Sequence, residues 1–152
     1  MYIPEIPNNS LTSEIEEIVK IARAVDGEAY FEFNEPATEA EIEETEKEFE
    51  TQLPESYKDW VRFSNGSVIF NTRLSFFSIH DLKRYQISKF PQDLIIIGQV
   101  VGDGEILCIS KSTGKFIRCF DGEERSFDNL NQFFVPLLKS MRRNAEELVG
   151  SF

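Results

Sequence analysis

Residues that bind metals, form disulfides or span membranes are scarce in this chain of 152 residues. The two cysteines, Cys108 and Cys119, cannot build a disulfide framework, and together with the single histidine, His80, they fit no common zinc spacing. The longest apolar run, residues 94–97, has the length of a strand and not of a membrane span. The first residues lack the basic and apolar regions of a signal peptide. We therefore expect no metal and a cytoplasmic, reducing location.

Motifs for phosphate binding and nucleophilic catalysis are also missing. Gly98, Gly102 and Gly104 follow a predicted strand, but a second strand comes after them where a phosphate site needs a helix. Gly114 lies in no phosphate-binding motif, and His80 has no nucleophile elbow nearby. The many carboxylates single out no catalytic pair. The sequence thus predicts neither a cofactor nor an enzyme, and a hydrolase that uses His80 is the alternative.

Positive charge is scarce in the first 60 residues, which carry 17 acidic and 4 basic side chains. Residues 61–152 carry 10 acidic and 12 basic side chains, and the whole chain has a net charge of −11. Nucleic acids and anionic membranes attract basic surfaces, so we expect neither as a partner. The acidic surface favours a basic protein.

The remaining composition is typical of a globular protein. Hydrophobic residues make up 41% of the chain, and 14 phenylalanines supply bulky packing material. The chain has no internal repeat and no linker-like segment. We expect a single domain over residues 1–152.

Two capping boxes predict the starts of the first helices. Ser13 with Glu16 opens a helix over 13–25, and Thr38 with Glu41 opens a second one. The spacing of apolar residues predicts the buried side of the second helix as Ile42, Thr45, Phe49 and, just beyond it, Leu53.

Two further helices are predicted later in the chain. Pro54 suits the first turn of a third helix, which Asn65 and Gly66 end. Its shared face comprises Tyr57, Trp60 and Val61. A last helix over 129–148 contains Pro136, which either kinks the helix or marks its true first turn.

Between these helices the sequence alternates as strands do. Extended segments are predicted over 29–33, 68–70, 74–79, 94–100, 105–110 and 115–120, with a short helical turn over 81–86. A two-residue turn before Lys115 would place Cys108 opposite Cys119, whereas a three-residue turn would break that pairing. Strand runs kept apart from helix runs predict an α+β fold with an antiparallel-rich sheet, on which the N-terminal helices and a C-terminal helix pack.

An ordered set of residues resembles the SUKH superfamily, which joins fungal cell-wall-synthesis regulators to many bacterial immunity proteins. The set begins at residues 33–38 and resembles a run of T, I, E, LP, Y and NG. It consists of Thr38, Ile42, Glu46, Leu53, Pro54, Tyr57, Trp60, Asn65, Gly66, Gly98 and Gly104. The resemblance covers about residues 31–140, and most of these residues look structural.

The resemblance implies an α+β fold, no catalysis and no cofactor. It further implies an immunity protein that binds and neutralises a cognate secreted polymorphic (LXG-type) toxin by stoichiometric binding. Because such toxins are often basic nucleases, an RNase is the expected target. The alternative is a scaffold or regulatory adaptor that resembles the fungal members. The oligomeric state stays open.

The partner surface is expected where acidic residues have no structural task. Residues 41–50 contain six acids and one lysine, so they either form a solvated face or attract a basic partner. The hairpin turn near Gly104 is a second candidate surface. The candidate toxin-binding residues are Glu41, Glu43, Glu44, Glu48, Glu50, Asp103 and Glu105.

Overall fold

The computed structural model describes residues 1–100, 104–120 and 122–152. The candidate residue Asp103 lies outside these described residues, as does Gly102. The helices are α1 (Thr12–Ala24), α2 (Glu39–Glu48), α3 (Glu55–Val61), the 3₁₀ turn η1 (Ile79–Asp81), α4 (Leu82–Tyr85) and α5 (Leu130–Val149). The strands are β1 (Glu32–Phe33), β2 (Ser67–Ile69), β3 (Leu74–Phe76), β4 (Leu94–Val100), β5 (Ile106–Ser110), β6 (Phe116–Phe120) and β7 (Glu123–Phe127).

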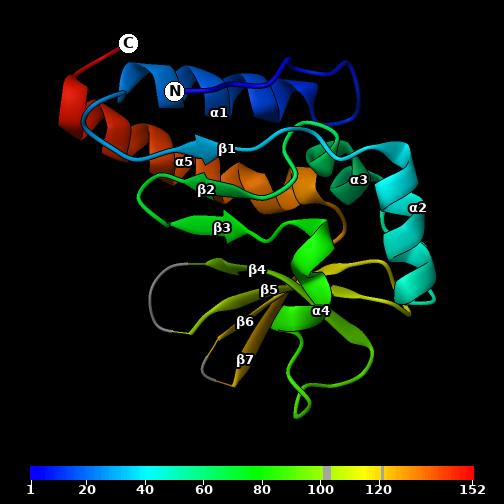
Figure 1. Ribbon diagram of the computed structural model, residues 1–152. Helices are drawn as coiled ribbons and strands as arrows, with labels where there is room; N and C mark the ends of the chain where they lie inside the picture. The colour runs from blue at the N-terminus through cyan, green and yellow to red at the C-terminus, as the bar shows by residue number, and fades with distance from the viewer. Residues whose placement is uncertain (101–103, 121) are drawn as a thin grey trace.

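The described strands form one antiparallel sheet whose spatial order, β1 to β7, is the order of the chain (Figure 1). Every strand therefore pairs with the strand next to it in sequence. Helices precede, interrupt and follow the strands, so the predicted α+β fold with its antiparallel sheet is confirmed.

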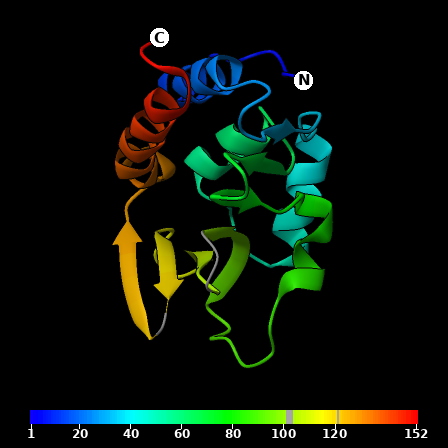
Figure 2. The same cartoon turned by 90° about the vertical axis from the view of Figure 1, so that its left-hand side faces the viewer.

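The terminal helices α1 and α5 lie side by side, and both chain ends lie at that end of the molecule (Figures 1 and 2). Trp60 lies at the centre of the core with no exposed surface, and its ring is 5.0 Å from that of Phe76 and 5.4 Å from that of Phe134. The indole therefore joins α3, β3 and α5. Tight packing of large aromatic rings is a major contribution to the stability of a core of this size.

The first helix starts differently from the prediction. It begins at Thr12, and no side chain caps it at Leu11. The preceding turn supplies the hydrogen bonds instead, because Asn9 Oδ1 accepts the N–H of Leu11 at 2.9 Å and Thr12 Oγ1 accepts the N–H of Asn9 at 2.8 Å. The predicted capping box of Ser13 and Glu16 is therefore wrong.

Two other helix ends also differ. α3 ends at Val61, four residues before Asn65, so the Asn65-Gly66 pair does not end it. In α5 the Asn129 side chain caps the first turn by accepting the N–H of Gln132 at 2.9 Å. Pro136 lies inside this helix and not in its first turn. Because proline has no N–H, the carbonyl of Gln132 lacks its usual helical donor.

The predicted strands omit β7, and the predicted alternatives for the pairing of Cys108 with Cys119 are decided by the structure. Strand β7 was not predicted, because residues 123–126 are all exposed and give no apolar alternation. In the β5–β6 hairpin Cys108 pairs with Ile117 and Cys119 pairs with Ile106. The two cysteines are thus diagonal neighbours and not directly opposed, and both are free thiols. Burial raises the pKa of both thiols.

None of the helices among the described residues has the length and apolar character that crossing a membrane requires.

Candidate functional site

Helix α2 carries most of the acidic side chains that the sequence singles out, and a capping box fixes where it begins. Thr38 Oγ1 accepts the backbone N–H of Glu41 at 3.1 Å, and Glu41 Oε1 accepts the N–H of Thr38 at 2.9 Å. Each side chain satisfies a donor that the first turn of a helix leaves without a partner. The predicted start at Thr38 is confirmed.

α2 buries one side and exposes the other. Ile42, Thr45 and Phe49 are buried against the core, and Leu53 joins them from the following turn. The exposed side carries Glu43, Glu44, Lys47, Glu48 and, just beyond the helix, Glu50. The predicted division into a buried and an outer side is confirmed.

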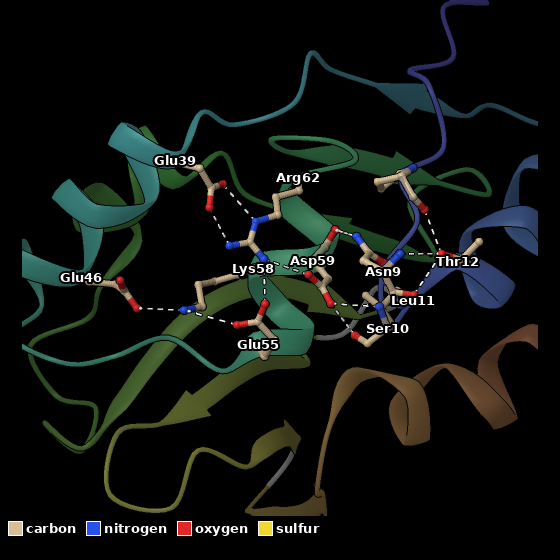
Figure 3. A network of polar contacts seen from close by, with 11 residues as sticks. Asn9, Ser10, Leu11, Thr12, Glu39, Glu46, Glu55, Lys58, Asp59 and Arg62 are labelled. Atoms are coloured by element: carbon tan, nitrogen blue, oxygen red, sulfur yellow. Dashed lines mark hydrogen bonds and ion pairs between the residues drawn. The ribbon is translucent and has the colours of Figure 1, made fainter.

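Lys58 of α3 and Arg62, the C-cap residue that follows it, pair with the acids at the junction of α2 and α3 (Figure 3). Lys58 Nζ lies 3.7 Å from a carboxylate oxygen of Glu46 and 3.5 Å from one of Glu55. Arg62 donates to both oxygens of Glu39, at 2.7 and 3.0 Å, and to Glu55 at 2.8 Å. The hydrogen bonds between Arg62 and Glu39 lower the pKa of that carboxyl and raise the pKa of the guanidinium. These acids hold helices together and leave little net charge for a partner.

Asp59 extends the same network into the interior (Figure 3). Its side chain is almost completely buried, and Oδ2 accepts the Oγ–H and N–H of Ser10 at 2.5 and 3.1 Å. Oδ1 accepts from Arg62 at 2.9 Å. A buried carboxylate requires such partners, so Asp59 fixes the N-terminal segment on α3. Sequence analysis missed this residue, although Asp59 and Arg62 stand at helical i, i+3 spacing.

Glu41 also has an internal task beyond capping. Its Oε2 accepts from His80 Nε2 of η1, and the opposite ring atom, Nδ1, accepts from Asn65 Nδ2 at 3.1 Å. The hydrogen bond from the Thr38 backbone is the main cause of a lowered pKa of Glu41, and the nearby His80 contributes to it. Glu41 therefore connects α2 to η1, and its carboxylate is less available to a partner than those of its neighbours.

Ser78, His80 and Glu41 lie in the order of a hydroxyl, an imidazole and a carboxylate, with Ser78 Oγ at 3.0 Å from His80 Nδ1. A hydrolase would need that Nδ1 lone pair to take the serine proton. Here Asn65 Nδ2 donates to the same nitrogen, and Ser78 Oγ donates to Asn65 Oδ1 at 3.3 Å. These hydrogen bonds connect α2, Asn65 and η1 to one another.

Four of the candidate glutamates remain without internal partners. Glu43, Glu44, Glu48 and Glu50 are exposed, and their carboxylates make no ion pair or hydrogen bond with any residue in the described ranges. Like charges at helical spacing repel one another and destabilise a helix slightly. The outer side of α2 therefore carries four solvated carboxylates without ion pairs, with Lys47 among them, and we call these four glutamates the acidic face.

Glu50 holds an unusual backbone conformation at the end of this face. Its φ of +52° lies in the left-handed region, where glycine is the favoured residue. The N–H of Glu50 donates to Lys47 O at 3.2 Å, and the N–H of Thr51 donates to Glu46 O at 3.1 Å. These two bonds form a Schellman motif that ends α2. The glutamate side chain thus occupies a site at which its backbone is strained.

The second predicted surface lies elsewhere. Glu105 precedes β5 and pairs with Arg118 of β6 at 2.8 Å, so its charge is already compensated. Figure 1 shows the start of β5 on the side of the molecule opposite α2. Within the described residues the structure does not bring Glu105 and the acidic face together.

Asn65 and Gly66 organise the junction between β1, α3 and η1. Asn65 Oδ1 accepts the N–H of Ile79 at 2.8 Å, and its own N–H donates to Glu35 O at 3.0 Å. Gly66 has a φ of +89°, and a Cβ there would lie 2.9 Å from Asn34 Nδ2. A side chain at position 66 would therefore be strained and crowded.

The other motif residues fill or shape the core. Leu53, Tyr57 and Trp60 are buried, and Pro54 is the N-cap residue of α3. Glu46 Oε2 accepts the N–H of Leu53 at 2.8 Å, which fixes the turn between α2 and α3.

Two glycines of the motif, Gly98 and Gly104, are required by the backbone for different reasons. At Gly98 a Cβ would lie 2.3 Å from the carbonyl oxygen of Ser75, so β3 and β4 can approach only without a side chain there. Gly104 has a φ of +81° at the entry to β5. Both positions demand glycine for backbone reasons.

In the part of the chain that the structure describes, no three His, Cys, Asp or Glu side chains converge as a metal site would require.

Residues 36–135, about two thirds of the chain, match the model of the SMI1 / KNR4 family (SUKH-1). The chain belongs to this family. The resemblance to the SUKH superfamily seen in the sequence is thereby confirmed. A search of curated proteins gives no match.

The SUKH-1 match begins just before the capping box of α2 and ends within α5. It includes the acidic face and its ion network on α3, whereas α1 and the N-terminal segment lie outside it. The partners of Asp59 on that segment are therefore beyond the matched region.

Proposed function

We propose that the protein is an immunity protein that binds a cognate secreted polymorphic (LXG-type) toxin stoichiometrically and neutralises it without catalysis. SUKH-1 membership supports this class of function. We further propose a nuclease, specifically an RNase, as the toxin, since a nuclease presents basic side chains where phosphates bind. The chain would act in the cytoplasm as one domain over residues 1–152, with no cofactor, nucleic acid or membrane as partner.

The observation that carries the proposal is the contrast between two sides of α2. The acids beside α3 are paired with Lys58 and Arg62, whereas Glu43, Glu44, Glu48 and Glu50 are exposed without partners. Carboxylates held on a helix can occupy the positions that substrate phosphates would take on a nuclease. Glu41 belongs at the margin of the proposed surface because it already has internal partners. The hairpin with Asp103 and Glu105 stays a separate second candidate surface, and the charge of Glu105 is already paired with Arg118.

Co-expression with the toxin domain encoded beside its gene tests the proposal directly. We expect cells to survive and the two proteins to elute together as a stoichiometric complex on a sizing column. Continued killing without complex formation would contradict an immunity role.

The alternative is a non-enzymatic scaffold or regulatory adaptor like the fungal members of the superfamily. Gene neighbourhood separates the two: an adjacent large reading frame with a nuclease-like tail supports immunity, and its absence supports the adaptor. A hydrolase acting through His80 is the third alternative. Its signature would be an activity that the His80→Ala substitution abolishes, and we expect no such activity.

A further inference from the structure

A groove lies between the N-terminal residues and β1, away from the acidic face. It has a volume of about 650 Å³, and its walls come from residues 1–2, 26–33 and Asn71. Met1, Tyr2 and Tyr30 on its rim are each more than half exposed, which is unusual for large apolar side chains. The groove thus combines a hollow with exposed aromatic surface.

The edge of the sheet faces this groove. β1 is the first strand of the sheet and pairs only with β2 among the described strands. Tyr30 and Glu32 are exposed whereas Phe31 and Phe33 are buried, which is the alternation of an extended chain. Residues 30–33 therefore run as an edge strand along the floor of the groove.

Backbone hydrogen bonds show which way each residue of this strand points. The N–H of Tyr30 donates to Asn71 Oδ1 at 2.7 Å, and its carbonyl accepts the N–H of Asn71 at 2.8 Å. The N–H of Asn34 donates to Ser64 Oγ at 2.9 Å. Both residues thus face inward, and alternation directs the N–H and C=O groups of Phe31 and Phe33 outward. An unpaired edge of this kind is a template for another strand.

The charge of the groove indicates what kind of strand it would accept. Asp26, Glu28 and Glu32 are exposed on its walls, and no basic side chain is among the described lining residues. Even when the α-ammonium group of Met1 is counted, the negative charges in the groove outnumber the positive ones. Exposed tyrosine rings add faces on which cations bind.

We propose that this groove binds an extended, lysine- or arginine-bearing segment of a partner protein, which adds to the free edge of β1 as an extra strand. Main-chain bonds to Phe31 and Phe33 supply the affinity, and the acidic wall selects basic side chains. A second copy of this chain fits poorly, because antiparallel pairing of two β1 edges would bring the exposed Glu32 side chains of both copies close together. The site is separate from the acidic face and does not depend on the proposed toxin.

Fluorescence anisotropy with a labelled synthetic peptide of alternating lysine and valine tests the site. We expect saturable binding by the full chain. A peptide with N-methyl groups on its four central residues loses the strand donors on both edges, and we expect at least tenfold weaker binding. A glutamate–valine peptide should not bind.

A matched pair of variants locates the site. Glu28→Gln with Glu32→Gln should weaken peptide binding about threefold to tenfold, as expected for two exposed ion pairs. Glu16→Gln with Glu147→Gln removes the same charge from α1 and α5, outside both proposed surfaces, and should leave the affinity unchanged. Amide hydrogen exchange of Phe31 and Phe33 should slow when the lysine–valine peptide binds.

Three results would overturn the proposal. Equal binding of the N-methylated peptide would mean charge adsorption without strand addition. Equal weakening by the two variants would place the peptide elsewhere. A protein that is already a dimer, with the amides of Phe31 and Phe33 protected before any peptide is added, would identify a second copy as the occupant.

Discussion

At the scale of the residue, a few side chains carry tasks that their neighbours in sequence do not reveal. Trp60 and Tyr57 were recognisable as core residues from their helical spacing. The role of Asp59 was not, because its partner Ser10 lies 49 positions away and only the folded chain brings them together. The strain at Glu50 was equally hidden, since no local pattern marks a glutamate at positive φ.

Replacing Trp60 with alanine empties the centre of the aromatic core. We expect a loss of about 3–5 kcal/mol in the free energy of unfolding, because the surrounding rings cannot close the cavity. Urea denaturation measures this change. Val135→Ala on the exposed side of α5 is the control and should change stability by less than about 0.5 kcal/mol. A small effect at Trp60 would mean that the core repacks.

Glu50→Gly relieves the strained end of α2. We expect the free energy of unfolding to rise by about 0.5–1 kcal/mol, since glycine adopts a φ of this sign without a steric penalty. Thermal or urea denaturation checks the gain. The same substitution should slow association with the cognate toxin if Glu50 contacts it.

Glu50→Ala is the control, because it removes the carboxylate and keeps the strain. It should slow association similarly without the gain in stability. Higher stability with an unchanged association rate would remove Glu50 from the proposed surface.

At the scale of the element, prediction succeeded where the pattern is local. β4 was predicted with its observed bounds because its apolar run starts after the polar residues 92–93 and ends near the turn signal of residues 102–104. Thr38 was predicted as the N-cap of α2 because both partners of its capping box are three residues apart. β7 was not predicted because its residues are exposed at the edge of the sheet. The start of α1 was predicted wrongly because the turn at Asn9 supplies its hydrogen bonds. Tertiary context decided both.

The junction between α2 and η1 should respond to acid. The folded state lowers the pKa of Glu41, so its contribution is present above the unfolded value of about 4.3 and is lost as pH falls through the lower folded value. Glu41→Gln keeps an oxygen for the capping box but loses the charge. We expect the variant to be less stable at neutral pH and its stability to depend less on pH below about 4.3.

Urea denaturation at a series of pH values measures this difference. Glu43→Gln, an exposed and unpaired neighbour, serves as the control and should follow the unmodified protein. If the two variants gave the same pH dependence, the negative charge of Glu41 would contribute nothing to stability through its contacts with Thr38 and His80.

At the scale of the whole molecule, the acidic face and the β1 groove are two surfaces on different elements. The net charge of −11 made an acidic surface predictable, but only the ion network on α3 shows which acids remain available. The groove could not be predicted, because it forms where residues 1–2 meet residues 26–33.

Charge at the acidic face should govern the rate of association with the toxin. Replacing Glu43, Glu44 and Glu50 together with glutamine should slow association, most strongly at low salt, because screening already weakens the attraction at high salt. Stopped-flow or surface-based kinetics at several salt concentrations measure this. The matched control replaces Glu5, Glu16 and Glu147, three exposed acids on other segments. Equal slowing by both triple variants would reveal a general effect of net charge.

The sequential order of the sheet has a consequence for how the chain folds during synthesis. Each strand pairs with its predecessor, so the sheet can assemble in the order of synthesis, although α2 and α3 separate β1 from β2, and η1 and α4 separate β3 from β4. The packing of α1 on α5 is different, because it joins the two ends of the chain. On a ribosome α1 must therefore wait for this contact until residues 130–149 have emerged, so the apolar side chains of α1 that pack on α5 stay uncovered until then.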